Sequence, residues 1–531
     1  MSYRVCLPTA GTGSRLGSAT RYINKSLITI SLQPSISRII NQFPDDTEWV
    51  IPLGCHGDQV RDFLELAYPN RTFFFANVNP YEGPKSGLGL SILSVRQFLQ
   101  QPFIFISCDT LVSGSIPSPD TNWMGFAKAE QIDSYRCLSI ENGSVKSLLE
   151  KGEGLLHRDY PYIGIAGISD YSTFWNAMET GGIEAITQGE SWGLRSLIPQ
   201  GIQAIPFEWW DTGTPLSLEN TRRHFQSTQP HDAPHILEKE NEAIWFIDDH
   251  VIKFSADSAF IANRVQRTTE LGSYVPQITG VRNQFYQYKR VEGDVLASTV
   301  TRPVFEQFLE FSKGFWEPHA LSEAENSDFR TRCLHFYKDK TEARIQQFYT
   351  TFNRNDMAQS INDTPMPLLS ELMQQVPWEL LSNGLPVRYH GDFHFENILH
   401  DRRTGKFTLL DWRQDFAGLL KTGDQYYDFA KLLHGILVSH EMVDRNLFKV
   451  EWSDSEIRYE ILRSSRHVEC EHLFETWLTT NGYSVFKVRL LTAIVYLNIA
   501  ALHHYPYSLF LFALGKDLLA KTLQENGLTP S

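Results

Sequence analysis

The chain has 531 residues, of which 42% are hydrophobic and 21% are charged. This composition is typical of folded globular proteins, and the length predicts about two or three domains rather than one hydrophobic core. The net charge of −14 argues against broad binding to nucleic acids or anionic membranes, because such binding requires a basic surface.

The six cysteines are scattered along the chain, and no two of them have a Cys-x-x-Cys spacing. They are therefore expected to be free thiols in a reducing compartment rather than zinc ligands or redox pairs. The N-terminus leads directly into an expected strand, without a signal peptide. The most apolar late segment, residues 490–502, is shorter than the ~20 residues that span a bilayer. These features predict a cytoplasmic protein without a membrane partner.

Strand and helix patterns alternate through residues 1–225. The expected strands are residues 3–8, 48–53, 71–77 and 103–107, and the expected helices are residues 58–68 and 87–100. This order predicts an α/β domain in which a doubly wound, mostly parallel sheet lies between helices. Ligands of such sheets bind at the carboxyl ends of the strands. The segments that follow the first and last of these strands are therefore the places to search for a site.

A glycine-rich turn, Leu7-Pro-Thr-Ala-Gly-Thr-Gly-Ser-Arg-Leu-Gly17, follows the first expected strand. Its glycines would allow backbone N–H groups to approach a triphosphate, and Arg15 and Lys25 add positive charge. An ordinary strand–helix turn is the simpler alternative. A dinucleotide-binding turn is disfavoured because Leu16 stands where its third glycine belongs, and a Walker A loop is excluded because no Gly-Lys-Ser/Thr follows.

The pattern changes after the first domain. Residues 222–240 lack apolar periodicity and include two prolines, so we expect domain one over 1–225 and a linker over 226–240. Residues 243–254 and 283–291 look like strands of a small antiparallel sheet, and from residue 301 the pattern is mainly helical. We therefore expect a second, α+β domain over 241–531. Its sheet-containing part would cover about 241–292 and its larger helical part about 293–531.

The second domain contains the sequence His390-Gly-Asp-Phe-His-Phe-Glu-Asn397. Its spacing matches the protein-kinase catalytic loop, in which the aspartate accepts the proton of the substrate hydroxyl and the asparagine binds Mg²⁺. Asp392 and Asn397 take these positions, and Asp411, after the apolar run 407–410, is expected to be a second Mg²⁺ ligand. A metal cluster of alternating residues on one strand face (His390, Asp392, His394 and Glu396) is the rival, but it does not account for Asn397 or Asp411.

The first domain resembles the sugar-phosphate and choline-phosphate nucleotidyltransferase family, whose fingerprint is an apolar strand, a Gly-x-Gly-x-Arg-Leu turn and a lysine further along. The resemblance implies a Rossmann-like fold, and residues 83–89 look like the base-recognition loop. It implies nucleotide contacts from Ala10, Gly11, Gly13 and Ser14, catalytic cations at Arg15 and Lys25, metal ligands at Asp109 and Asp211, and an acceptor-phosphate contact from Lys151.

The second domain resembles the aminoglycoside phosphotransferase and choline kinase family, which implies a bilobal protein-kinase-like fold. Lys253, in the strand 251–254, corresponds to the lysine that contacts the ATP phosphates. Residues 286–293 look like the hinge between the lobes, and residues 423–430 look like a structural helix start. Glu270 is the acidic residue that we consider as the partner of Lys253.

Together these features predict a bifunctional Mg²⁺-dependent transferase. It would phosphorylate a small hydroxylated metabolite with ATP, couple the phosphate to a nucleotide from CTP with release of pyrophosphate, and so supply a surface polysaccharide or lipid precursor. UTP and dTTP are alternatives to CTP, and the acceptor could be choline, a polyol, an amino acid amide or a sugar. Two other functions stay open: an antibiotic-type phosphotransferase with a regulatory nucleotide-binding domain, and a pair of inactive nucleotide sensors. A homo-oligomer is compatible with the sequence.

Overall fold

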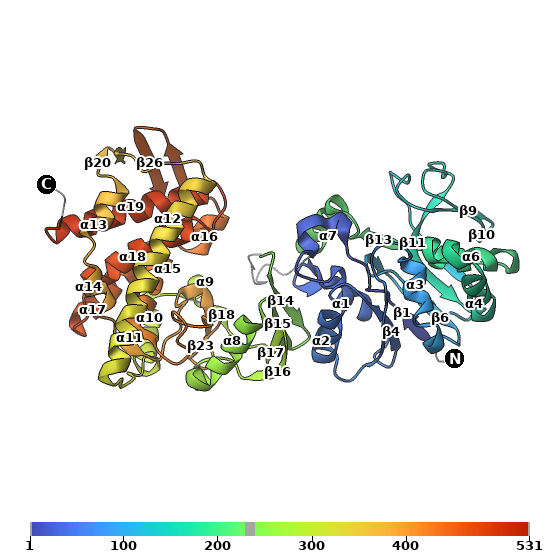
Figure 1. Ribbon diagram of the computed structural model, residues 1–531, viewed down its shortest axis with the longest axis horizontal. Helices are drawn as coiled ribbons and strands as arrows, with labels where there is room; N and C mark the ends of the chain where they lie inside the picture. The colour runs from blue at the N-terminus through green and yellow to red at the C-terminus, as the bar shows by residue number, and fades with distance from the viewer. Residues whose placement is uncertain (1–2, 229–238, 529–531) are drawn as a thin grey trace. The chain divides into compact units, whose positions relative to one another are not determined.

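The computed structural model describes residues 3–228 and 239–528 (Figure 1). Its contacts divide the chain into two compact units. Unit 1 comprises Met1–Ile261 and Thr279–Arg290, and unit 2 comprises Ala262–Ile278 and Val291–Ser531. Each unit has its own sheets and helices and is described by itself. The mixed α/β class predicted from the sequence is confirmed.

A nine-stranded sheet with the order β5-β4-β1-β6-β11-β8-β12-β10-β9 forms the centre of unit 1. Its strands are β1 (Arg4–Cys6), β4 (Glu48–Leu53), β5 (Thr72–Asn77), β6 (Phe103–Ile106), β8 (Trp123–Phe126), β9 (Cys137–Glu141), β10 (Ser144–Leu149), β11 (Tyr160–Ile168) and β12 (Gln203–Pro206). The strands β5, β4, β1 and β6 are parallel, as predicted, whereas β11 joins β6 in the antiparallel direction. The parallel half therefore carries the doubly wound topology. The other half is mixed, because β8 and β12 are parallel whereas its other pairs are antiparallel.

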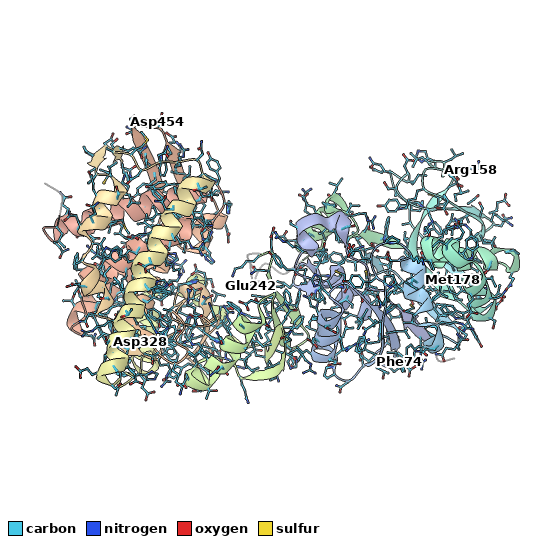
Figure 2. All side chains as sticks on the ribbon, viewed as in Figure 1. Phe74, Arg158, Met178, Glu242, Asp328 and Asp454 are labelled. Atoms are coloured by element: carbon cyan, nitrogen blue, oxygen red, sulfur yellow. The ribbon has the colours of Figure 1, made fainter. Side chains whose placement is uncertain are left out.

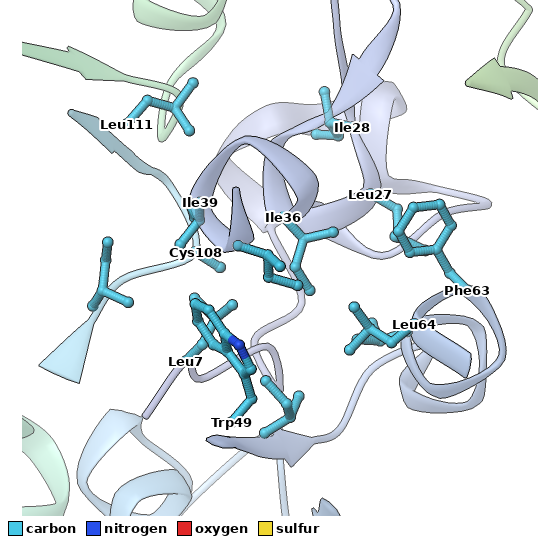
Figure 3. Packing of buried hydrophobic residues seen from close by; sticks show 14 of the residues in the cluster. Leu7, Leu27, Ile28, Ile36, Ile39, Trp49, Phe63, Leu64, Cys108 and Leu111 are labelled. Carbon is cyan, nitrogen blue, oxygen red and sulfur yellow. The ribbon is translucent and has the colours of Figure 1, made fainter. Parts of the chain in front are cut away.

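Two apolar clusters pack against this sheet in unit 1. Figure 3 shows the first, in which Leu7 and Trp49 from the strand side meet Ile36 of α1 (Ser35–Ile40) and Phe63 of α2 (Gly57–Ala67). These side chains are almost fully buried, and such burial stabilises a fold by roughly 1.5–3 kcal/mol for each large apolar side chain. The packing fixes where the strands end and so positions the turns that follow them.

The helix expected over residues 87–100 is shorter in the structure. Helix α3 covers Leu88–Leu93, and a separate 3₁₀ turn covers Arg96–Phe98. Between them Val95 leaves the helical conformation and packs, fully buried, in the second apolar cluster. Packing of this side chain overrides the continuous helical pattern of the sequence.

A four-stranded sheet with the order β14-β15-β17-β16 belongs largely to unit 1. Its strands are β14 (Glu242–Ile247), β15 (His250–Ser255), β16 (Ile278–Arg282) and β17 (Phe285–Lys289). Trp245 of β14 packs edge-on against Phe63 of α2, with ring centroids 5.2 Å apart, and its indole N–H donates to the Thr29 hydroxyl at 2.9 Å. The sheet that the sequence analysis placed in the second domain thus shares a core with the first.

The predicted linker falls mostly outside the described residues, which omit 229–238. Helix α7 (Pro215–Ser227) reaches two residues into it. Near the end of the predicted linker, Lys239 forms an ion pair with Glu242 at 3.0 Å. Glu242 is the first residue of β14 and is labelled in Figure 2. The assignment of 1–225, 226–240 and 241–531 as domains and linker stays a prediction.

Unit 2 is mainly helical. Helix α15 (Gln425–Leu437) is almost entirely buried, and it packs against α18 (Val485–Ala500), which in turn packs against α19 (Tyr507–Glu525). A short three-stranded sheet contains β18 (Asp294–Val295), β22 (Ile398–Asp401) and β23 (Lys406–Leu409). Within residues 3–228 and 239–528, no helix is long and apolar enough to cross a membrane.

The chain after residue 301 is mainly helical, as expected, but it also contains a sheet that the sequence analysis did not predict. A four-stranded sheet contains β19 (Gln359–Ile361), β20 (Thr364–Met366), β25 (Phe448–Trp452) and β26 (Glu456–Ile461). The parallel pair β19–β26 joins segments that are far apart in the sequence. Strands β19 and β20 have three residues each, and β25 and β26 contain several charged residues. Such strands give little local signal, because their stability depends on cross-strand packing.

Two candidate active sites

The glycine-rich turn of unit 1 continues the path of β1 along β4, because the N–H groups of Leu7 and Thr9 donate to carbonyls of β4. The turn then reverses at Gly13, whose φ is +67°. A Cβ at this position would lie 2.7 Å from the methyl group of Thr20, so the turn requires glycine here. Gly11 lies in open space and allows a ligand to approach the backbone. Gly54, which the sequence analysis missed, packs directly on the backbone of Ala10.

Asp109 lies after β6 and binds the two predicted cations. The Lys25 ammonium forms an ion pair with its carboxylate, and the Arg15 guanidinium lies 3.8 Å from the same oxygen. Burial by itself raises the pKa of Asp109, but Lys25 and a hydrogen bond from Ser107 outweigh burial and lower the pKa to about 2. Asp109 is therefore a permanent anion at neutral pH, held at the carboxyl end of a central strand.

Asp211 is brought to Asp109 by strand pairing. It ends β13 (Glu208–Asp211), which pairs with β7 (Thr110–Ser113) so that Asp211 lies opposite Thr110. The next residue, Thr212, donates its N–H to the carbonyl of Asp109 at 3.0 Å. Two residues that are far apart in the sequence are therefore neighbours.

The carboxylates of Asp109 and Asp211 converge on Gly213. A Cβ at Gly213 would lie 3.0 Å from an oxygen of each carboxylate. The Tyr135 hydroxyl donates to Asp211 at 3.1 Å. Two converging carboxylates are a donor set that fits Mg²⁺, which takes one or two carboxylates together with phosphate oxygens and water. In the described ranges no group of three or more His, Cys, Asp or Glu is arranged to hold a metal, so the ion would depend on such outside ligands.

Lys151 is exposed in the turn after β10. Its neighbour Glu150 accepts from Arg136 at 3.0 Å and also binds Arg195. These two arginines fix the turn, while the acceptor-phosphate role of Lys151 stays a prediction. Glu190, which the sequence analysis did not single out, is buried at the start of α6 (Glu190–Leu197), and burial raises its pKa to about 7.

In unit 2 the His390 segment is held by Asp428 of α15. Its carboxylate accepts from the backbone N–H groups of His390 and Gly391 at 2.8 and 2.7 Å, and from the Trp316 indole at 3.0 Å. Gly391 has φ +87°, and a Cβ there would lie 2.6 Å from the Cβ of Arg413. The Asp428 contacts and the close packing at Gly391 therefore hold the backbone of this segment in one conformation. This agrees with the structural role expected for residues 423–430, which include Asp428.

Asp392 is contacted on both carboxylate oxygens. The Asn397 amide donates to Oδ2 at 3.1 Å, and the Lys431 ammonium lies 2.8 Å from Oδ1. His394 lies 3.5 Å from Oδ2 and 2.8 Å from Glu396. Burial lowers the pKa of His394, but these two carboxylates more than offset burial and raise the pKa to about 9, so the ring is a cation.

Asp411 follows β23 in the left-handed conformation, with φ +55°. The N–H of the preceding Leu410 donates to the carbonyl of Asn397 at 2.7 Å, so Asn397 and Asp411 lie at the same end of the β22–β23 hairpin. Arg264 lies 3.4 Å from the Asp411 carboxylate. The amide oxygen of Asn397 and the Asp411 carboxylate form an oxygen donor set of the kind that Mg²⁺ prefers.

The rival metal cluster does not form in the described part of the chain. His390 directs Nε2 to the carbonyl of Leu410 at 2.8 Å, and burial lowers its pKa to about 3, so it is a neutral structural residue. His394 is occupied by its two carboxylates.

Lys253 lies on β15 in unit 1 and is 5% exposed, opposite Tyr286 in the strand pair. Its ammonium lies 5.9 Å from the centre of the Tyr288 ring. Glu270, on α8 (Ser258–Leu271), lies 3.8 Å from Lys421. The assignment of Lys253 to ATP binding stays a prediction.

Lys431 is the main residue at this site that the sequence analysis missed. It lies three residues after Asp428 on a helix whose apolar pattern marks it as core. A buried lysine on such a helix is a weak sequence signal, because only the fold brings it to Asp392.

Residues 323–450 match the phosphotransferase enzyme family (APH), which confirms the predicted resemblance of the C-terminal part to phosphotransferases. A search of curated proteins gives no match.

Solved structures similar to the N-terminal part of the chain include nucleotidyltransferases, the class that its motifs resemble. UDP-glucose pyrophosphorylase from Acinetobacter baumannii is 15% identical, and the match covers 44% of this chain and 95% of that one with a TM-score of 0.37. A putative glucose-1-phosphate thymidylyltransferase from Bacillus anthracis is 16% identical, and the match covers 45% of this chain and 98% of that one with a TM-score of 0.37. CTP:phosphocholine cytidylyltransferase from Streptococcus pneumoniae is 13% identical, and the match covers 42% of this chain and 99% of that one with a TM-score of 0.36.

Proposed function

We propose that the chain is a bifunctional enzyme that first phosphorylates a small hydroxylated metabolite with ATP and then couples the phosphate to a nucleotide, with CTP as the expected donor. The observation that carries the proposal is the convergence of Asp109 and Asp211 beside Lys25 and Arg15, on a chain whose C-terminal part matches a phosphotransferase family. The product would be an activated precursor for a surface polysaccharide or lipid, made in the cytoplasm.

The chemistry of the first site follows from its charges. An oxygen of the acceptor phosphate would attack the α-phosphorus of the nucleotide, and pyrophosphate would leave. Arg15 and Lys25 would stabilise the negative charge that develops on the phosphates. Asp109 and Asp211 would hold Mg²⁺, which supplies Lewis-acid neutralisation of the triphosphate when bound.

The second site supports phosphorylation of an alcohol. Asp392 would accept the hydroxyl proton and orient the attacking oxygen. This is the role that the spacing His390-x-Asp392-x4-Asn397 predicts for the aspartate. Asn397 and Asp411 would hold Mg²⁺ at this second active site. Lys253 would contact the α- and β-phosphates of ATP.

Separate variants test the two activities. Asp392→Ala should reduce ATP-dependent phosphorylation of an active acceptor by at least about 100-fold, because a positioned base is lost. It should leave pyrophosphate release from CTP and a phosphorylated acceptor unchanged. Asp109→Asn should give the reverse pattern. The acceptor would be found first by screening choline, polyols, amino acid amides and sugars with ATP and Mg²⁺ for ADP formation.

Pyrophosphate release with CTP, UTP and dTTP then identifies the nucleotide. If no nucleotide yields pyrophosphate with any phosphorylated acceptor while ATP is consumed, the nucleotidyltransferase half of the proposal is wrong. In that case an antibiotic-type phosphotransferase would be the better description.

A further inference from the structure

We infer that Lys431 is a further catalytic residue of the kinase site, and that its ammonium contacts the phosphoryl group while this group passes from ATP to the acceptor. The inference rests on the proposed kinase function of Asp392. Nothing in the sequence motifs assigns a role to Lys431.

Lys431 lies 2.8 Å from Oδ1 of Asp392, whereas Asn397 and His394 lie on the side of Oδ2. A hydroxyl that gives its proton to Asp392 must lie within about 3 Å of the carboxylate. The attacking oxygen and the Lys431 ammonium would therefore meet at one carboxylate, and we place the phosphorus under attack beside both.

The side chain of Lys431 is 9% exposed, whereas that of Asp392 is 39% exposed. The carboxylate is thus the more accessible of the two groups, and the Lys431 ammonium lies beside it with little access to water. Burial by itself lowers the pKa of Lys431, but Asp392 more than offsets burial and raises it. The lysine is a cation in a partly desolvated place, where a charge acts more strongly on a neighbouring anion than it does in water.

The other cations around this segment have other partners. Arg267 is bound to the backbone carbonyls of Tyr389, Arg413 and Leu420, and Arg264 lies beside Asp411. The cationic His394 lies 3.5 Å from Oδ2 of Asp392 and is also paired with Glu396. Lys431 is the cation that the structure places on Oδ1 of the expected base.

The substrate oxygen forms a bond to the γ-phosphorus, and the bond between this phosphorus and the β–γ bridging oxygen breaks. ADP leaves with the electron pair of that bond, and the hydroxyl proton moves to Asp392. Lys431 stays protonated throughout and moves its contact from Asp392, as the carboxylate is neutralised, to the phosphoryl oxygens that carry charge in the transition state.

The test compares Lys431→Met with Lys431→Arg in the full-length protein. Loss of the cation should lower kcat for ATP-dependent phosphorylation by about 100-fold, with little change in KM for ATP, because the contact forms fully only in the transition state. Lys431→Arg keeps the charge and should be measurably more active than Lys431→Met. Nucleotidyl transfer should be unchanged in both.

Lys487→Met is the matched control. Lys487 is also a buried lysine of unit 2, but its ammonium donates to the carbonyl of Asn383 at 2.8 Å, so kcat should stay near that of the wild type. Thermal unfolding and ATP-induced stabilisation are measured for every variant. A folded, ATP-binding Lys431→Met protein with wild-type kcat would overturn the inference, as would equal activity of the Met and Arg variants.

If Lys431→Met does not fold, Lys431→Arg alone tests the inference. A folded Lys431→Arg protein that is as inactive as Asp392→Ala would overturn it. Failure of the underlying function looks different, because wild-type protein would then phosphorylate no acceptor and Asp392→Ala would have no effect.

Discussion

At the scale of single residues, environment gives acidic groups of unit 1 opposite behaviour. Asp109 is buried beside Lys25, and its pKa is lowered to about 2. Glu190 is also buried, but one carboxylate oxygen is without a hydrogen-bond partner in the described structure. Burial raises its pKa to about 7, and Arg136 opposes this shift only in part. Both residues carry a carboxylate, so their opposite pKa shifts come from their different local partners.

Glu190 gives a prediction for stability against pH. Its folded pKa of about 7 lies above the ordinary value of 4.5, so the unfolded chain loses the proton first as the pH rises. Glu190 should therefore destabilise the fold increasingly between about pH 4.5 and 7, by up to about 3 kcal/mol above that range. Glu190→Gln should raise the free energy of unfolding at pH 8 and change it little at pH 4.5.

Denaturant unfolding of both proteins across this pH range measures the difference. Glu184→Gln, at an exposed position of α5 (Gly182–Gln188), serves as the control substitution. A Glu190→Gln gain that is equal at pH 4.5 and 8 would contradict the raised pKa.

At the scale of elements, Gln59 of α2 supports the loop that carries Lys25 and is itself contacted by a side chain next to β17. The Gln59 amide of α2 accepts from the N–H of Asn24 at 3.0 Å and donates to the carbonyl of Tyr22 at 3.0 Å. The same amide donates to the side chain of Gln284, next to β17, at 3.1 Å. Gln59 is 5% exposed, so these hydrogen bonds are shielded from water and fix its orientation.

We therefore predict that Gln284→Ala weakens nucleotidyl transfer. Loss of one buried hydrogen bond costs about 1 kcal/mol, which corresponds to about a fivefold lower kcat if the bond positions Lys25. Gln59→Ala should have a larger effect, because it removes the contacts to Asn24 and Tyr22 as well. Steady-state pyrophosphate release measures both. Gln287→Ala, two strand positions beyond Phe285, is the comparison, and a kcat as low as that of Gln284→Ala would show that the effect is not specific to this hydrogen bond.

The sequence indicated the residue types of both sites but only part of their surroundings. Asp392 and Asn397 stand at a fixed local spacing, so one segment reveals them together. Asp109 was found as a strand-end residue and Asp211 through the family resemblance, and the β7–β13 pairing shows why they meet. Lys431 and Tyr135 could not be found in this way, because each reaches its carboxylate only through packing of distant elements.

At the scale of the whole molecule, the compact units do not follow the expected division into two enzymes. The sheet that carries Lys253 belongs to unit 1, where Trp245, Phe254 and Phe285 join the same apolar cluster as Phe63. The N–H of Phe246 also donates to the carbonyl of Leu32 at 2.9 Å. A shared core of this kind makes the stability of one predicted domain depend on residues of the other.

Trp245→Ala should therefore destabilise the nucleotidyltransferase site although Trp245 lies in the predicted kinase domain. Removing a fully buried tryptophan costs about 3–5 kcal/mol. We expect a lower unfolding temperature for unit 1 and weaker stabilisation by CTP, measured by thermal unfolding with and without the nucleotide. Trp245→Phe keeps most of the apolar contact and should be milder. Unchanged CTP-dependent unfolding in Trp245→Ala would show that the two sheets are energetically independent.

The sequence by itself determined the kinds of residues available for chemistry: a glycine turn with two cations, Asp109 at a strand end, and an Asp392–Asn397 spacing followed by Asp411. These signals are local, because each depends on residues within one strand, turn or loop. The tertiary structure alone decided which distant groups share a site, and it placed Lys431 against Asp392, Asp211 against Asp109, and the Lys253 sheet in the core of unit 1. Burial and strand pairing join segments far apart in the chain, and no local pattern of residues specifies such contacts.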